Sequence, residues 1–448
     1  MLFKITLFNI GMAFFLANKI AAQDSTLIGT RVRWDLVKCI DYAVKNNIQI
    51  NALRLSQQTS QQQYLLAKAA RLPNLAGTAS QNFEHANGMN YNSAGMLSNS
   101  SGLTASGSYG LSSSVTLYNG NYLNNTILQA NLSVQAANLT IIAQENDVSL
   151  SVTQAYLAIL LDKENIVSDS DLVITATAQV KQEQQMYNVG SVARYALIQL
   201  EAQLSTDNFT LVSAQNTQRT DILTLKELLF LPAGVGFDVI KPDSIVVIDI
   251  VAPFHQVEQI ALSNRPEVKN GELDVKIAQY GVAIAKAGYK PTLLAGGSLN
   301  TGYVTGQGGF PGQLNSNFNQ QIGLTLAIPI FTKRVVKTQV EEAKIYVEQA
   351  DLTLKNTKIT LSQTVERAFI NVENAKSQYA AALKQYEYNQ EGYRIASEQL
   401  KVGVANIVAF LLQKNLFILA QGAYIQAKYN DLLTLKIYDF YRGIPIKL

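Results

Sequence analysis

The sequence has little of the chemistry that an enzyme or a metalloprotein needs. Its 448 residues include one cysteine, Cys39, and two histidines, His85 and His255. A single cysteine cannot form an intrachain disulfide, and Cys39, beside Ile40 in a predicted helix, is interpreted as a packed residue and not as a nucleophile. Neither histidine has a partner at metal-ligand spacing. The sequence therefore predicts no enzyme, no metal site and no cofactor.

Charge is also scarce, since only 15% of the residues are charged and the formal net charge is +3. This balance offers no basic patch for nucleic acid, so no nucleic-acid partner is predicted. Beyond the N-terminal region we find no stretch long and apolar enough to cross a membrane as a helix. If the protein enters a membrane, we expect it to do so as strands.

The N-terminus has the features of an export signal. Residues 1–23 contain Lys4 near the start, then an apolar run from Ile5 to Leu16, then small residues at Ala21 and Ala22. A membrane anchor, the alternative, would need about twenty apolar residues, and polar residues interrupt this run. We therefore predict a cleaved secretory signal peptide at residues 1–23 and an exported mature protein.

Proline and glycine are missing from two long stretches. Residues 121–189 contain neither, and residues 332–400 contain no proline and one glycine, Gly392. Apolar residues in the second stretch recur at alternating steps of four and three, which predicts one continuous helix about 100 Å long. These seam positions are Val336, Val340, Ala343, Val347, Ala350, Leu354, Thr357, Leu361, Val365, Ala368, Val372, Ala375, Tyr379, Ala382 and Tyr386. Because many are Ala or Val, we expect several closely packed helices.

The two stretches belong to an internal repeat, because seam positions of the first coincide with those of the second after a shift of 213 residues. The matching positions are Ile127, Ala130, Val134, Ala137, Ile141, Val148 and Ala155. We predict a first repeat at 24–230 and a second at 254–448, joined by a connector at 231–253 with a β-rich run from Ile245 to Val251. In the first repeat we expect a helix from Asp35 to Arg71, a β-hairpin at about 75–118, a long helix at about 121–186 and a helix at about 192–230. The corresponding elements of the second are a helix at about 257–289, a hairpin at about 292–330, a long helix at about 332–399 and a helix at about 405–438.

Both hairpins alternate apolar with small or polar residues, most clearly from Leu103 to Leu117. Polar loops are expected at about 85–102 and 305–317. Strands of about ten residues with this pattern fit a transmembrane β-barrel, although a soluble sheet packed on helices has the same period. Four strands cannot close a barrel, and open edges do not occur in lipid. Several chains would then share one barrel, of eight, twelve or sixteen strands for two, three or four copies.

The order helix, hairpin, long helix, Val-Gly turn, helix, given twice, resembles the TolC-type outer-membrane efflux protein family over essentially the whole mature chain. The segments that carry the resemblance are Ala43 to Ile50, Ala261 to Val268, Ala67 to Pro73, Ala285 to Pro291, Pro329 to Phe331, and the turns at Val189-Gly190 and Val402-Gly403. The resemblance implies a homotrimer with a shared twelve-stranded barrel in the outer membrane, continued by an α-helical barrel across the periplasm. It also implies a periplasmic adaptor and an inner-membrane pump as partners.

Family members can close the periplasmic tip with tyrosine, arginine and aspartate side chains near these turns. Here the corresponding positions look like Leu400, Ala405, Ala409 and Leu412, with Ala196 in the first half, and none of them is charged. We therefore expect the tip to be closed by packing and neutral contacts. The candidate tip and gate residues are Tyr187, Val189, Gly190, Arg194, Gln199, Leu400, Val402 and Gly403.

These features predict a mainly α-helical protein with a transmembrane β part. The expected function is that of an outer-membrane exit duct in a tripartite efflux or type I secretion system. Such a duct conducts passively, because no nucleotide or proton-relay site is visible in the sequence. The alternative is a non-conducting periplasmic coiled-coil adaptor or scaffold. A need for detergent and conductance in planar bilayers would favour the duct.

Overall fold

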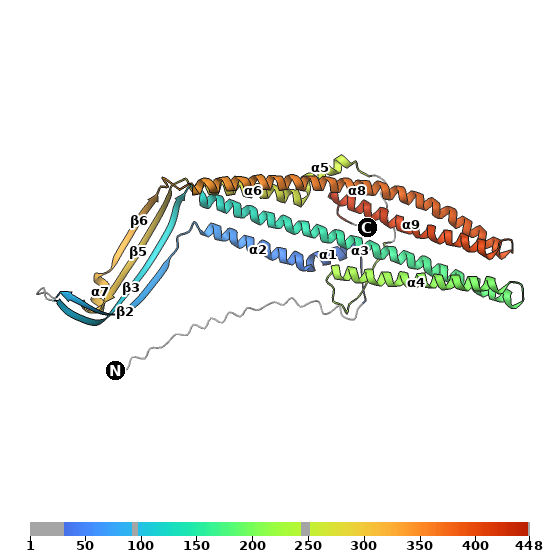
Figure 1. Cartoon of the computed structure of the whole chain (residues 1–448), viewed down its shortest axis with the longest axis horizontal. Helices are drawn as coiled ribbons and strands as arrows, with labels where there is room; N and C mark the ends of the chain where they lie inside the picture. Colours follow the sequence, from blue (N-terminus) through green and yellow to red (C-terminus); the bar gives the residue numbers. More distant parts are fainter. Residues whose placement is uncertain (1–30, 92–96, 243–250, 447–448) are drawn as a thin grey trace, which may run out of the picture.

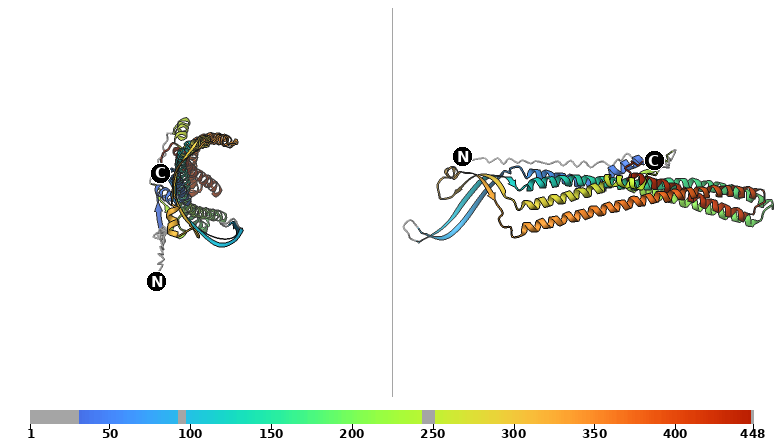
Figure 2. Two further views of the ribbon diagram at one scale, coloured as in Figure 1. Left: turned by 90° about the vertical axis from the view of Figure 1, so that its left-hand side faces the viewer. Right: turned by 90° about the horizontal axis from the view of Figure 1, so that it is seen from above.

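The computed structural model describes residues 31–91, 97–242 and 251–446. The predicted signal peptide and almost all of the β-rich run Ile245 to Val251 lie outside these ranges. The described chain is elongated, with a four-stranded sheet at one end and long helices that continue away from it (Figure 1). Seen along the long axis, the helices form a curved layer and not a closed bundle (Figure 2).

The helices of the two halves have pairwise equal lengths. They are α1 (Leu36–Asn46) and α5 (Phe254–Asn264) with 11 residues, α2 (Ile48–Ala69) and α6 (Pro266–Ala287) with 22, α3 (Tyr122–Asn188) and α8 (Val335–Lys401) with 67, and α4 (Arg194–Leu228) and α9 (Ile407–Tyr441) with 35. At 1.5 Å per residue, α3 and α8 are each about 100 Å long.

The first helix predicted in each half is in fact two helices. In the first half the break is at Asn47, whose side chain accepts hydrogen bonds from the amides of Gln49 and Ile50 and so caps α2. In the second half Pro266 starts α6 and holds Arg265 in an extended conformation, with ψ at 134°. The predictions of unbroken helices from Asp35 to Arg71 and from 257 to 289 were therefore wrong.

The heptad seam predicted for α8 is confirmed. All fifteen seam positions are buried or half-buried, and every buried residue of α8 belongs to the seam. α8 packs against α6 and α9, whereas α3 packs against α2, α4 and α6. Because the seam residues are small, each long helix fits against two or three neighbours along its length.

The main sheet has the order β2-β3-β5-β6 and is antiparallel throughout. Its strands are β2 (Ala76–Tyr91), β3 (Leu97–Asn119), β5 (Thr292–Val304) and β6 (Asn319–Ala327). The first hairpin lies where it was predicted, but its two strands are longer, since strand pairing continues through most of the expected loop at 85–102. The expected loop at 305–317 contains a short helix, α7 (Phe310–Ser316). β6 ends two residues before Pro329, which lacks the amide hydrogen that a strand ladder needs.

A second, small sheet was not predicted. β1 (Arg31–Trp34) pairs in parallel with β4 (Gly236–Val239), and Trp34 and Phe237 from these strands enter the main hydrophobic core with Tyr156 of α3. The Oη of Tyr156 donates to the carbonyl of Ile240 at 2.5 Å. These contacts fix the segment after α4 against the middle of α3.

One described helix, α9, is long and apolar enough to cross a membrane by length and composition, with a mean hydropathy of 1.3. The expectation that no stretch passes this test was wrong. The reason is that α9 is apolar on two sides: Phe410 and Phe417 are buried against the helices, while Leu412 and Leu419 are exposed.

Candidate functional site

The end of the molecule far from the sheet is formed by two turns, one between α3 and α4 and one between α8 and α9 (Figure 1). Gly190 has a φ of 76° and Gly403 a φ of 74°, in the left-handed region that favours glycine. The Gly190 amide donates to the carbonyl of Tyr187 at 2.9 Å, and the Gly403 amide to that of Leu400 at 3.1 Å. Both helices thus end in the same Schellman-type cap, which reverses the chain within a few residues.

The other predicted tip residues lie at or beside these turns. Val189 and Val402 are exposed, and Tyr187, in the last turn of α3, is 37% exposed. Arg194 is the first residue of α4 and is exposed. An exposed apolar side chain at each turn gives the tip an apolar surface, whose contact with water is unfavourable.

Gln199 is half-buried one turn further along α4. Its Nε2 donates to the Oη of Tyr195 at 2.6 Å, while its Oε1 is buried without a partner among the described residues. Gln179, on α3, also has a buried Oε1 without a hydrogen bond in the described part of the chain. Polar groups in this condition weaken local packing, because each has lost its water without a replacement.

A pocket of about 420 Å³ lies between the two turns. Its walls come from the ends of α3 and α8 and from the starts of α4 and α9, so the two halves of the chain meet here. Leu400, Gly403, Ala196 and Ala405 line it. The remaining candidates, Tyr187, Val189, Gly190, Arg194, Gln199 and Val402, do not. Two charged side chains, Glu183 and Lys401, also line the pocket, and burial raises the pKa of the Glu183 carboxyl.

Above the pocket, an apolar layer joins the two helical hairpins. Leu200 of α4 packs with Ile407 and Phe410 of α9, and Ala196 and Leu400 lie against them. The layer buries apolar side chains from both hairpins, so opening the tip between them would expose these side chains to water.

A buried ion pair lies next to this layer and was missed by sequence reasoning. The Nζ of Lys414 on α9 is 2.7 Å from the Oδ2 of Asp207 on α4, and the two side chains are only 1% and 4% exposed. Gln203 Nε2 donates to the second carboxylate oxygen at 2.8 Å. Burial, and next the charge of Asp207, raise the pKa of Asp169 on α3. Removal of either partner would leave a buried, uncompensated charge, so the pair ties the two hairpins together.

A signal for this pair exists in the sequence. Lys414 stands four residues after Phe410 and three before Phe417, which is the position of a seam residue and not of a surface lysine. Asp207 follows the buried Leu200 by seven residues on α4. A charged residue on a heptad seam calls for a partner of opposite charge, and each of the two hairpins supplies one.

A second buried acidic group lies nearer the middle of the helices. The carboxyl of Asp162 on α3 lies close to that of Asp221 on α4, and its Oδ2 is buried without a hydrogen-bond partner among the described residues. Burial, and then the neighbouring carboxylate, raise the pKa of Asp162 to about 7. The pair can share one proton below that pH, whereas above it two negative charges face each other.

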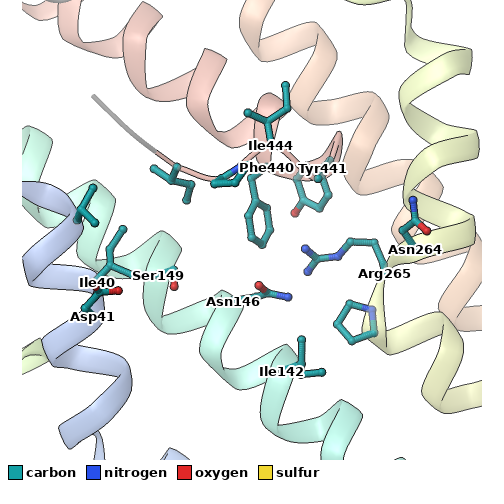
Figure 3. A pocket seen from close by; sticks show the side chains of 15 residues that line it. Ile40, Asp41, Ile142, Asn146, Ser149, Asn264, Arg265, Phe440, Tyr441 and Ile444 are labelled. Atoms are coloured by element: carbon teal, nitrogen blue, oxygen red, sulfur yellow. The ribbon is translucent and has the colours of Figure 1, made fainter.

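The middle of the molecule holds a pocket of about 460 Å³ between α1, α3, the α5–α6 break and the C-terminal segment. Figure 3 shows Arg265 on one side of this space and Phe440 and Tyr441 on another, with Asn146 of α3 below them. The Arg265 guanidinium lies 4.4 Å from the centre of the Phe440 ring and pairs with Glu267 at 2.7 Å. These contacts hold the end of α9 against the α5–α6 break of the same half.

Residues 39–229 and 257–435 match the model of a family described as outer membrane efflux protein. The chain belongs to this family. The matched ranges include at least part of every described helix and leave out the connector. As a member of the outer membrane efflux protein family, the chain is an outer-membrane protein whose helical part extends into the periplasm.

Individual relatives are distant. The outer membrane efflux protein BepC of Brucella suis is 22% identical over 325 residues, which cover 72% of this chain and 64% of that protein. The chain thus spans less than two thirds of that relative's length. A membrane protein from Pseudomonas aeruginosa has a solved structure with a TM-score of 0.77 and 17% identity, covering 91% of this chain and 93% of the other. The CmeC outer membrane channel of Campylobacter jejuni has a TM-score of 0.76 and 20% identity, covering 91% and 86%. These structures show that the fold is that of a TolC-type channel.

Proposed function

We propose that this protein is the outer-membrane exit duct of a tripartite efflux or type I secretion system. Three copies close one twelve-stranded β-barrel, and their helices continue it as a tunnel through the periplasm. Substrates pass without energy input from this chain. An inner-membrane pump drives them and a periplasmic adaptor joins the pump to the duct, so no catalytic step or cofactor is assigned to this chain.

The observation that carries the proposal is the pair of unpaired sheet edges. Among the described residues, β2 and β6 are each paired on one side only, and Ile322 of β6 is 94% exposed. Such an edge cannot lie in lipid, because the backbone groups would have no hydrogen-bond partners there. Joining β6 of one copy to β2 of the next satisfies both edges, and the likeness to TolC-type channels supports three copies.

The equal helix lengths support a division of the chain into two tandem repeats, 24–230 and 254–448, around the connector at 231–253. Each repeat supplies one β-hairpin to the barrel and one helical hairpin to the tunnel. The two glycine turns then lie together at the periplasmic entrance, where the adaptor docks. Tyr187, Val189, Arg194, Gln199 and Leu400 are the side chains that we assign to this entrance.

A pair of cysteine variants tests the duct. Ser108 Oγ lies 2.7 Å from Ser80 Oγ, so both point to the polar face of the sheet, while Tyr109 points to the opposite face. In planar bilayers, a charged thiol reagent that cannot cross lipid should lower the conductance of Ser108→Cys. It should leave that of Tyr109→Cys unchanged. The native Cys39 is fully buried, so the protein without an introduced cysteine should not react with the reagent.

A product that is soluble without detergent, monomeric and silent in bilayers would reject the duct and support the scaffold function. Equal block of both cysteine variants would show that the polar face does not line the pore. Trimer formation is measured separately, by native mass spectrometry of the protein in detergent.

A further inference from the structure

Basic side chains gather, without acidic ones, where the sheet meets the helices. Residues 275–340 contain six basic residues and no acidic one, and residues 48–144 contain three basic residues and a single acidic one, Glu84 in β2. Seven of these basic residues flank three of the strand–helix junctions, and all seven are exposed. We call them the junction collar: Lys68, Arg71, Lys286, Lys290, Lys333, Arg334 and Lys337.

Contacts between the junctions place the collar residues in one continuous row. Arg71, after α2, donates a hydrogen bond to Asn124 of α3. Lys290, after α6, packs closely on the turn before α3. A Cβ added to Gly120 in this turn would lie only 2.6 Å from the Cβ of Lys290. A Cβ added to Gly288, which follows α6, would lie 3.1 Å from the side chain of Val336 in α8. The junctions of α2, α3, α6 and α8 are therefore neighbours, at the same level of the long axis (Figure 1).

A pocket of about 490 Å³ opens within this row. Lys290, Tyr122 and Asn119 supply polar groups to its wall, and Ile328 and Pro329 supply apolar ones. The wall thus offers a cation and a hydroxyl beside an apolar surface. A phospholipid needs the same combination, with donors for its phosphate and apolar contacts for the start of its acyl chains.

The collar also follows an apolar band in the order that a bilayer requires. On the sheet side of the α8 junction, Ile330 is 95% exposed and is followed by the exposed ring of Phe331. Lys333 and Arg334 follow in the chain after one residue, Thr332. In a bilayer, apolar side chains suit the hydrocarbon core and aromatic rings suit its boundary with water. Long basic side chains suit the level of the headgroups, so the order along this segment matches the order of the layers.

The collar charges have no bound acid in the described part of the chain. Within the described residues none of the seven forms an ion pair; Lys68 lies 4.3 Å from the centre of the Tyr64 ring. Glu341, the nearest acid along α8, is bound to Lys344 at 2.9 Å, although Lys337 also contributes to lowering its pKa. The described residues therefore leave the collar open to counter-charge from outside the chain.

We propose that the junction collar binds anionic phospholipid headgroups of the membrane leaflet that faces the periplasm, with Lys290 and its pocket as the most structured headgroup site. The proposal rests on the proposed function, because that function places the sheet in the membrane and the helices in the periplasm. The collar would then fix the depth at which the barrel sits in the bilayer.

The test uses the full chain reconstituted in phosphatidylcholine vesicles with or without phosphatidylglycerol. The collar variant is Lys290→Gln/Lys333→Gln/Arg334→Gln. The control variant, Lys181→Gln/Arg219→Gln/Lys384→Gln, removes three exposed basic residues far from the junction. Native mass spectrometry after extraction counts the phospholipids retained per chain, and inorganic phosphate at matched concentration serves as the competitor.

Each basic side chain near an anionic surface favours binding by about fivefold. We therefore expect the parent and the control variant to retain phosphatidylglycerol over phosphatidylcholine, and the collar variant to lose at least about tenfold of that preference. Retention of both lipids in equal amounts by the parent would overturn the proposal. So would equal retention by collar and control variants, or full displacement by inorganic phosphate.

Conductance of the same vesicles separates this inference from the function on which it rests. A parent that inserts and conducts but shows no preference for phosphatidylglycerol refutes only the headgroup site. A parent that neither inserts nor conducts refutes the duct and, with it, the membrane position of the collar.

Discussion

Breaking the buried pair between Lys414 and Asp207 should both destabilise the protein and open its tip. Lys414→Met leaves Asp207 charged, 4% exposed and bound only to Gln203. Removing one partner of a buried pair costs about 3 to 5 kcal/mol, because the other charge stays out of water. The cost falls on the contact between the α3–α4 and α8–α9 hairpins, so the closed tip should lose more stability than any other part.

The assay combines thermal unfolding in detergent with single-channel conductance. Lys414→Met should lower the unfolding midpoint and raise the resting conductance. The double variant Asp207→Leu/Lys414→Met should recover most of the stability, since replacing both charges by apolar groups is often neutral or stabilising. Arg394→Met is the control, because it breaks an exposed pair with Glu391, and exposed pairs contribute little to stability.

Salt provides an independent check. A pair this buried is screened little by ions in solution, so the parent conductance should follow bulk conductivity between low and high salt. If Lys414→Met is as stable and as closed as Arg394→Met, the pair does not hold the hairpins together. A parent channel that opens sharply on adding salt would show that exposed ion pairs hold it shut.

Three further predictions concern the helices and the tip. The folded-state pKa of Asp162 is raised from 3.8 to about 7, so its stabilising contribution is complete below pH 3.8 and is lost progressively as the pH rises to about 7. Asp162→Asn should therefore raise the unfolding midpoint more at pH 8 than at pH 5, and the exposed Asp171→Asn should change it at neither pH. Ala368→Phe should cost about 1 to 3 kcal/mol by overpacking the seam, and equal stability of the exposed Lys384→Phe variant would show that the register is wrong. Leu400→Ser, in the wall of the tip pocket, should raise resting conductance more than Arg194→Ala, and the reverse order would reveal a charged gate.

The long elements could be predicted from the sequence because their signal is repeated many times. The α8 seam recurs over about seven heptads, so a single wrong position could not hide it. Helix breaks that depend on a single residue were harder to predict. Asn47 breaks the first helix through its side-chain cap, and the same residue type inside α3 does not. Only the packing of α1 and α2 against their neighbours distinguishes the two cases.

The tip was predicted in part. Glycine turns leave a clear sequence signal, and both Gly190 and Gly403 lie where the periodic pattern ends. The link between Asp207 and Lys414 joins residues 207 positions apart in the chain. Each looks like an ordinary charged residue until the two hairpins are brought side by side. Pairings at this range depend on the fold, which a pattern along one helix does not contain.

The equal lengths of α3 and α8 constrain how such a protein can change over evolutionary time. One extra heptad in α3 alone would move its turn about 10 Å beyond the turn of α8. The tip pocket and the apolar layer between Leu200 and Phe410 would then come apart. A lineage that needs a longer or shorter duct must alter α3, α4, α8 and α9 by the same whole number of heptads. We therefore expect insertions in one half of the gene to be found together with matching insertions in the other.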